Sequence, residues 1–289
     1  MLRAIIKLAR PAHWLKNGVV LAALVFAGEL AHIDMIGIAL ASVVVFCLVS
    51  SGVYTFNDLI DRQRDRLHPV KKSRPLASGA VSPAAAIAMI ILLWSAGFAI
   101  SFLIGLPLLL IAVAYVALNI VYSYLLKNIV IIDVMTIAIG FVLRAYAGAV
   151  AIDVPASKWL IINTMLLALF LGFGKRRHEL VYIQDAESHR TILSKYSAYL
   201  LDQLIGIVTA SVVVVYMLYT FSPEVSEKLH TEYLFVTIPF VLYGIFRYLY
   251  LIHKEEKGGS PTRVLITDRP ILLNVSLWLL TVVIVLYVL

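Results

Sequence analysis

The sequence predicts an all-α membrane protein with several spanning helices. Hydrophobic residues make up 62% of the 289 residues and charged residues only 14%, a balance that ordinary soluble domains do not have. The apolar residues are grouped in runs of about twenty, the length that an α-helix needs to cross the hydrocarbon core of a bilayer. We therefore expect a single transmembrane domain that covers residues 1–289.

Nine apolar runs are candidates for spanning helices. Polar or charged segments separate most of them, and Asp268 and Pro270 mark the start of the last one, as a helix cap and a first-turn residue. In chain order the nine expected helices are residues 14–32, 34–56, 83–104, 106–126, 129–151, 157–174, 203–221, 233–252 and 270–289.

The basic residues predict the orientation of this bundle. If the N-terminus is cytoplasmic, all but four of the 24 Lys and Arg residues lie on the cytoplasmic side. The opposite side carries Lys158 and Lys228, while Arg144 and Arg247 fall within spans. The positive-inside rule thus predicts a multi-pass protein of the cell (inner) membrane with a cytoplasmic N-terminus. The net charge of +7 requires no nucleic-acid partner, because a basic face beside anionic lipid accounts for it.

The chemistry-capable side chains are concentrated in three cytoplasmic loops, residues 57–82, 175–202 and 253–269. Long polar loops in a compact protein tend to be functional. The apolar surfaces are less informative, because lipid-facing and subunit-facing residues look alike in a sequence. The sequence therefore leaves open whether identical chains associate.

An acidic segment follows the second expected span. On a continuous helix Asn57, Asp61 and Asp65 share one face and Asp58 lies beside it. Mg²⁺ prefers such oxygen ligands, and it usually takes one or two protein carboxylates and completes its shell with phosphate oxygens and water. The segment therefore predicts a Mg²⁺ site for a diphosphate, with Asp58, Asp61 and Asp65 as catalytic residues.

These carboxylates have an alternative interpretation as members of ordinary ion pairs. They lie at the C-terminal end of a helix, where the macrodipole disfavours negative charge, so something must offset them. The same loop carries six basic residues that could do so: Arg62, Arg64, Arg66, Lys71, Lys72 and Arg74. We prefer the metal site because functional sites are where proteins break local rules.

Two further residues are candidate substrate ligands. Arg144 lies well inside the fifth expected helix, and a membrane-embedded arginine is usually functional or paired, although it can also extend to the interface. Tyr54 lies one turn before Asp58 and could present its hydroxyl to a substrate; its alternative role is an interfacial aromatic anchor.

Several motifs resemble one known family. The segment from Asn57 to Asp65, followed by residues 72–79 (KSRPLASG), is similar to the first aspartate motif of the UbiA superfamily of intramembrane prenyltransferases. Residues 122–127 and 143–148 extend the resemblance over nearly the whole chain. It implies a nine-helix UbiA-type bundle in which the aspartate motif binds the Mg²⁺-diphosphate of a substrate.

Two other stretches narrow the resemblance. Residues 10–17 (RPAHWLKN) and 174–180 (GKRRHEL) are similar to the decaprenyl-phosphate phosphoribosyltransferase group. Members of that group join phosphoribosyl diphosphate to a polyprenyl phosphate and release diphosphate, which implies synthesis of a pentose donor for the cell envelope or cell wall. Aromatic prenyltransferases carry a second Asp-x-x-x-Asp motif in the loop after the sixth helix, and this chain lacks it. The chain has three cations there, at residues 175–177, followed by an isolated Asp185 and Glu187.

Two anionic substrates in one site require positive side chains. Lys16, Lys127, Lys175 and Arg176 are therefore expected to be substrate ligands, although each alone could simply extend to the interface and set orientation.

Two other functions stay open. An aromatic prenyltransferase of quinone or haem biosynthesis would use the same Mg²⁺ site, but the missing second aspartate motif disfavours it. A membrane transporter would be expected to have broken helices in corresponding halves, and the sequence shows no such pattern.

Overall fold

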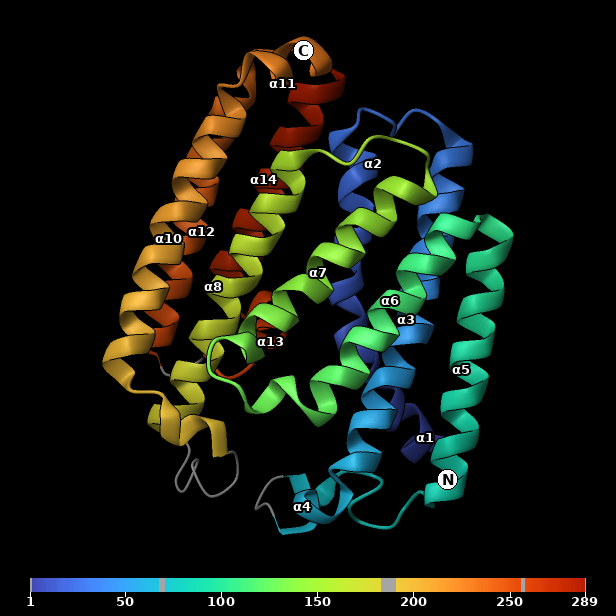
Figure 1. The fold of residues 1–289 in the computed structure, drawn as a ribbon. Helices are drawn as coiled ribbons and strands as arrows, with labels where there is room; N and C mark the ends of the chain where they lie inside the picture. Colours follow the sequence, from blue (N-terminus) through green and yellow to red (C-terminus); the bar gives the residue numbers. More distant parts are fainter. Residues whose placement is uncertain (1, 68–70, 183–190, 256–257, 289) are drawn as a thin grey trace. The chain divides into compact units, whose positions relative to one another are not determined.

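The computed structural model describes residues 2–67, 71–182, 191–255 and 258–288. Every regular element in these ranges is a helix, which confirms the predicted all-α class (Figure 1). The chain forms two compact units. Unit 1 comprises residues 1–24, 32–136 and 143–155, and unit 2 comprises residues 25–31, 137–142 and 156–289.

Unit 1 contains the N-terminal helices and three long helices that follow them. Their bounds are α1 (Leu2–Ala9), η1 (Pro11–Leu21), α3 (Ile33–Ile60), α4 (Arg62–Leu67), η2 (Lys71–Ser73), α5 (Pro83–Ile104), α6 (Leu106–Tyr124) and η3 (Leu126–Asn128). The short helix α2 (Ala22–Phe26) and the long helix α7 (Ile132–Ala151) each contribute residues to both units.

Unit 2 is built from long helices joined by short helical segments. Their bounds are α8 (Lys158–Tyr182), η4 (Thr191–Lys195), α10 (Ala198–Thr220), α11 (Pro223–Leu229), η5 (Tyr233–Thr237), α12 (Ile238–His253), α13 (Pro261–Thr267) and α14 (Arg269–Tyr287). Within this unit α8 packs along α10, and α12 along α14 (Figure 1).

Eight helices in the described ranges are long and apolar enough to cross a membrane. They are α3, α5, α6, α7, α8, α10, the continuous segment of η5 and α12, and α14. The chain is therefore a multi-span membrane protein, but nine spans are not confirmed. The first expected span, residues 14–32, is divided between the 3₁₀ helix η1 and the five-residue α2.

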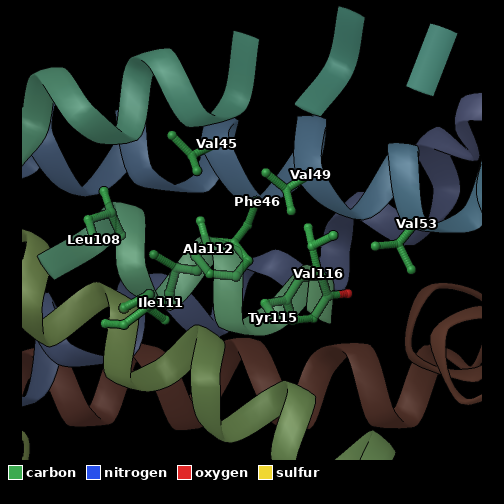
Figure 2. Packing of buried hydrophobic residues seen from close by; sticks show 11 residues of the cluster. Val45, Phe46, Val49, Val53, Leu108, Ile111, Ala112, Tyr115 and Val116 are labelled. Carbon is green, nitrogen blue, oxygen red and sulfur yellow. The ribbon is translucent and has the colours of Figure 1, made fainter. Parts of the chain in front are cut away.

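The core of unit 1 lies between α3 and α6. Its buried cluster includes Val45, Phe46 and Val49 of α3 and Ala112 and Tyr115 of α6, and the rings of Phe46 and Tyr115 meet edge to face at 5.6 Å (Figure 2). Many large apolar side chains on the outer surfaces of these helices are exposed instead. This distribution fits a bilayer, where lipid tails replace water around the outer helix faces.

Unit 2 has a separate core that is rich in aromatic residues. Tyr216 and Tyr219 of α10 pack with Leu234 and Val285, and Tyr216 forms a 2.7 Å hydrogen bond with Thr237. The indole of Trp278 also donates to the Tyr216 hydroxyl, at 3.1 Å. These bonds satisfy polar groups that would otherwise be costly to bury among apolar helices.

Candidate active site

The acidic segment lies at a break between two helices of unit 1. The predicted continuous helix is wrong here, because α3 ends at Ile60 and α4 begins at Arg62. Asp61 occupies the break, with φ −83° and ψ 4°. Asp58 and Asp65 therefore approach from two helices rather than from one face of a single helix, and both are only 3% exposed.

Arg74 joins the two buried carboxylates. Its Nη1 lies 2.9 Å from Asp58 Oδ1 and 2.7 Å from Asp65 Oδ2. Arg10 approaches Asp58 from the other side, with Nη2 at 2.5 Å from the same oxygen. Arg10 has a positive φ of 53°, the left-handed turn between α1 and η1 that carries this side chain to Asp58. Buried carboxylates need such compensation because desolvation penalises an isolated charge.

The other two residues of the motif face the end of α6. Asp61 Oδ1 accepts a 2.8 Å hydrogen bond from Lys127 Nζ, and the two residues also form an ion pair. The Ser123 hydroxyl lies within hydrogen-bonding distance of two acceptors, Asn57 Oδ1 and the Asn119 carbonyl oxygen. Asp61 keeps 32% of its side chain exposed, so it is the most accessible of the three carboxylates.

The donor set has the chemistry of a Mg²⁺ site. Within the described ranges, no three His, Cys, Asp or Glu residues are grouped closely enough to hold one metal ion. Mg²⁺ needs only one or two protein carboxylates, however, and the segment offers carboxylate and amide oxygens alone. These residues therefore fit Mg²⁺, which would replace at least one of the present basic partners.

Arg144 is buried in a polar network within unit 1. Its Nε donates to Asn17 Oδ1 at 2.8 Å, and its Nη2 donates to the Tyr115 hydroxyl at 2.6 Å. The guanidinium also lies over the Tyr115 ring, 4.6 Å from its centroid. Arg144 is only 4% exposed, so its side chain does not extend to the interface, which was the alternative interpretation.

Two more expected ligands lie near the N-terminal segment. Tyr54 contacts two residues there: the Arg10 guanidinium lies 5.2 Å from its ring centroid, and the His13 ring meets it edge to face. Lys16 lies on η1, outside the eight spanning helices. It makes no hydrogen bond or ion pair with any described residue. Burial, followed by the charges of Arg144 and Arg10, lowers the pKa of Lys16 to about 8.

Lys175 and Arg176 belong to unit 2. The helix α8 continues to Tyr182, past its predicted end at residue 174, so both cations are helical rather than part of a loop. Arg176 is buried and its Nη1 lies 2.7 Å from Glu179 Oε2, while the more exposed Lys175 lies 3.6 Å from Glu179 Oε1. Asp185 and Glu187, which follow in the sequence, lie outside the described residues.

Comparison with known proteins shows which family this chain belongs to. The profile of the UbiA prenyltransferase family matches residues 18–267, well over half of the chain. The chain belongs to the UbiA prenyltransferase family. This membership confirms the resemblance that the aspartate motif predicted.

Named relatives of this UbiA protein match it along nearly its full length. The decaprenyl-phosphate phosphoribosyltransferase of Mycolicibacterium smegmatis is 32% identical, over 98% of this chain and 92% of the relative. The protein of the same name from Corynebacterium glutamicum is also 32% identical, over 98% of this chain and 86% of its own.

Solved structures support the fold. A UbiA homologue from Archaeoglobus fulgidus, bound to GPP and Mg²⁺, superposes with a TM-score of 0.73 and covers 99% of this chain and 100% of its own. At 18% identity this similarity concerns the fold alone.

Several residues of the network were not expected from the sequence. Arg74 appeared there only as an ordinary ion-pair partner, and Arg10 and Asn17 only as parts of a motif. The signal for Tyr115 was weak, because a tyrosine in an apolar helix is common at membrane interfaces. A buried arginine needs hydrogen-bond acceptors, so Arg144 itself was the best pointer to these partners.

Proposed function

We propose that this UbiA protein transfers the 5-phosphoribosyl group of phosphoribosyl diphosphate to a polyprenyl phosphate of the decaprenyl type and releases diphosphate. The product would be a pentose donor for the cell envelope. The observation that carries the proposal is the charge-matched cluster at the break between α3 and α4. There Asp58, Asp61 and Asp65 lie among Arg10, Arg74 and Lys127. The names of the relatives agree with this reaction.

The aspartate cluster would receive the diphosphate end of the donor. Asn57, Asp58, Asp61 and Asp65 are the residues that would hold Mg²⁺. Bound there, the ion would supply positive charge that stabilises the departing diphosphate. The carboxylates are now balanced by Arg10, Arg74 and Lys127. A metal ion on the carboxylates would release these three basic side chains, which could then bind diphosphate oxygens.

The remaining cations would bind the other phosphate groups. Lys16 carries positive charge with no carboxylate partner in the described residues, and Arg144 donates to the neutral oxygens of Asn17 and Tyr115. Lys175 and Arg176 of α8 are further candidates. The Tyr54 hydroxyl would donate a hydrogen bond to phosphoribosyl diphosphate. We assign all of these residues to substrate binding.

The reaction itself requires no strong base from the protein. The bond between ribose C1 and the diphosphate oxygen breaks, and positive charge develops at C1. An anionic oxygen of the lipid phosphate then forms the new bond to C1, with no proton to remove. The side chains would therefore act mainly by positioning the two substrates and by offsetting their charge.

The proposal extends to the whole chain and its surroundings. We propose that residues 1–289 act as one catalytic domain, since the family match at 18–267 includes residues of both units. We also propose that the N-terminus and the loops of the site are cytoplasmic, because the basic residues favour that side.

The reaction can be tested with purified protein in detergent. Labelled phosphoribosyl diphosphate with polyprenyl phosphate should give labelled lipid in the presence of Mg²⁺, and chelation should abolish the product. A parallel reaction contains a labelled prenyl diphosphate and an aromatic acid. Prenylation of that acid, without phosphoribosyl transfer, would identify an aromatic prenyltransferase instead. Absence of transfer in both reactions, from folded protein, would reject both enzymes and favour a transporter.

A further inference from the structure

Unit 2 contains a cavity that lies away from the aspartate segment in sequence. It has a volume of about 540 Å³ and is lined by residues of α8 and of the segment that runs from residue 259 to residue 268. The polar side chains in its wall include His178, Ser260, Arg263 and Asp268. No residue proposed above as a metal or substrate ligand lines it.

Two glycines lie where this segment meets α8, and one of them, Gly259, lines the cavity. A Cβ on Gly259 would lie 2.6 Å from the His178 ring, and a Cβ on Gly258 would lie 3.1 Å from His178 Cβ and 3.3 Å from the Gly174 carbonyl oxygen. Only residues without a side chain allow this segment to lie directly against α8. The backbone is therefore fixed beside His178, and α13 starts from a defined position.

The charges in the wall favour an anion. The carboxylate of Asp268 is already engaged: Arg247 Nη2 lies 2.9 Å from Oδ2, and the Ile271 amide donates to Oδ1 at 3.1 Å. Arg263, by contrast, makes no side-chain hydrogen bond or ion pair with any described residue, and the same holds for the Ser260 hydroxyl. Both donors line the cavity: Ser260 is the extended N-cap residue of α13, and Arg263 lies in the first turn of that helix.

We propose that this cavity binds the phosphate group of an anionic ligand, with the Arg263 guanidinium and the Ser260 hydroxyl as donors. A guanidinium matches two phosphate oxygens with parallel N–H bonds, and a hydroxyl can bind a third. The phosphate can belong to a soluble diphosphate or to the headgroup of an anionic phospholipid. The site is independent of the proposed transfer reaction, because none of its residues has a role there.

Chemical modification can measure directly how accessible the Arg263 guanidinium is. Phenylglyoxal modifies accessible arginines, and mass spectrometry of peptides reports each one separately. Full-length protein would be placed in nanodiscs of phosphatidylcholine, with and without inorganic diphosphate, and in nanodiscs with phosphatidylglycerol but no diphosphate. Mg²⁺ is left out. Arg269 is the internal control, because it is exposed on the neighbouring helix and does not line the cavity.

The two sources of phosphate give different results. Protection of Arg263 by diphosphate indicates a soluble ligand, and protection by phosphatidylglycerol alone indicates a lipid headgroup. The variant Ser260→Ala should raise the ligand concentration for half-protection about fivefold, the effect of one lost hydrogen bond. The matched variant Ser211→Ala should not, since its hydroxyl bonds within α10. Full modification of Arg263 under all conditions, or equal protection of Arg269, would overturn the proposal.

Equilibrium dialysis provides a measurement without modification. The wild type should have one more binding site for labelled diphosphate than Arg263→Gln has. A parallel experiment makes the same comparison with a short-chain phosphatidylglycerol. The control Arg269→Gln should retain that site. Identical binding by both variants and the wild type, for both ligands, would contradict the proposal whether or not the protein transfers phosphoribosyl groups.

Discussion

Gly148 of α7 lies directly against the backbone of Val20 in η1. A Cβ at position 148 would come within 1.9 Å of the Val20 carbonyl oxygen. Gly148 is four residues after Arg144, and Val20 is three residues after Asn17, so each pair lies on one face of its own helix. The contact between Gly148 and Val20 therefore sets the distance at which Asn17 reaches Arg144.

The variant Gly148→Ala tests this contact. The methyl group meets backbone atoms that cannot move aside without shifting η1, so we expect a loss of about 1–3 kcal/mol of stability. Activity should fall with it, because Arg144 loses its partner Asn17. Thermal unfolding in detergent measures the first effect. Gly206→Ala is the control, since nothing lies within 4 Å of that position. Equal melting temperatures for the two variants would refute the role of the contact.

The variant Asp61→Asn tests the proposed metal site. It removes one negative charge at nearly constant volume and should abolish turnover while the protein stays folded. Asp34→Asn changes an exposed carboxylate at the opposite end of the same helix and should retain activity. Turnover is measured over a range of Mg²⁺ concentrations. Near-normal activity of Asp61→Asn at saturating Mg²⁺ would exclude a ligand role for this residue.

The variants Lys175→Ala and Arg176→Ala test the cations of unit 2. Each should raise the KM for phosphoribosyl diphosphate, or lower kcat, by at least about tenfold, the effect of one lost charged hydrogen bond. Lys175 is the cleaner test because it is 43% exposed, whereas Arg176 is buried beside Glu179 and its loss also affects folding. Lys254→Ala is a control at an exposed helix end. Unchanged kinetics in both variants would leave these cations as orientation signals.

The activity should depend on pH through Lys16. Its pKa is lowered to about 8, so this side chain is charged below that pH and neutral above it. If the charge binds a substrate phosphate, kcat/KM should fall about tenfold per pH unit above 8, because kcat/KM reports ionisations of the free enzyme. Lys16→Arg stays charged throughout this range. A profile that is the same in Lys16→Arg and the wild type would assign the decline to another group.

Sealed vesicles test the predicted orientation. If the site opens to the cytoplasm, inside-out vesicles should consume externally added phosphoribosyl diphosphate at the full rate. Right-side-out vesicles should be inactive until they are permeabilised. An impermeant dye serves as the control for sealing. Equal rates in the two intact orientations would contradict a cytoplasmic site.

The sequence by itself was sufficient for the class of protein and for the members of the acidic motif. Hydropathy determines spanning helices almost alone, because the bilayer leaves a chain few ways to satisfy its backbone hydrogen bonds. This is why α3, α5 and α6 lie close to their expected positions. The motif of Asp58, Asp61 and Asp65 was visible because charged residues stand out beside an apolar run.

Only the tertiary structure decided how these residues are paired. Lys127 meets Asp61 across 66 positions of the chain, and Arg144 meets Asn17 across 127. The break at Asp61 and the extension of α8 past residue 174 were also unpredictable, because local sequence limits a helix end only weakly. Periodicity tells which face of a helix is polar. Which distant charge meets that face depends on close packing, such as the backbone contact of Gly148 with Val20.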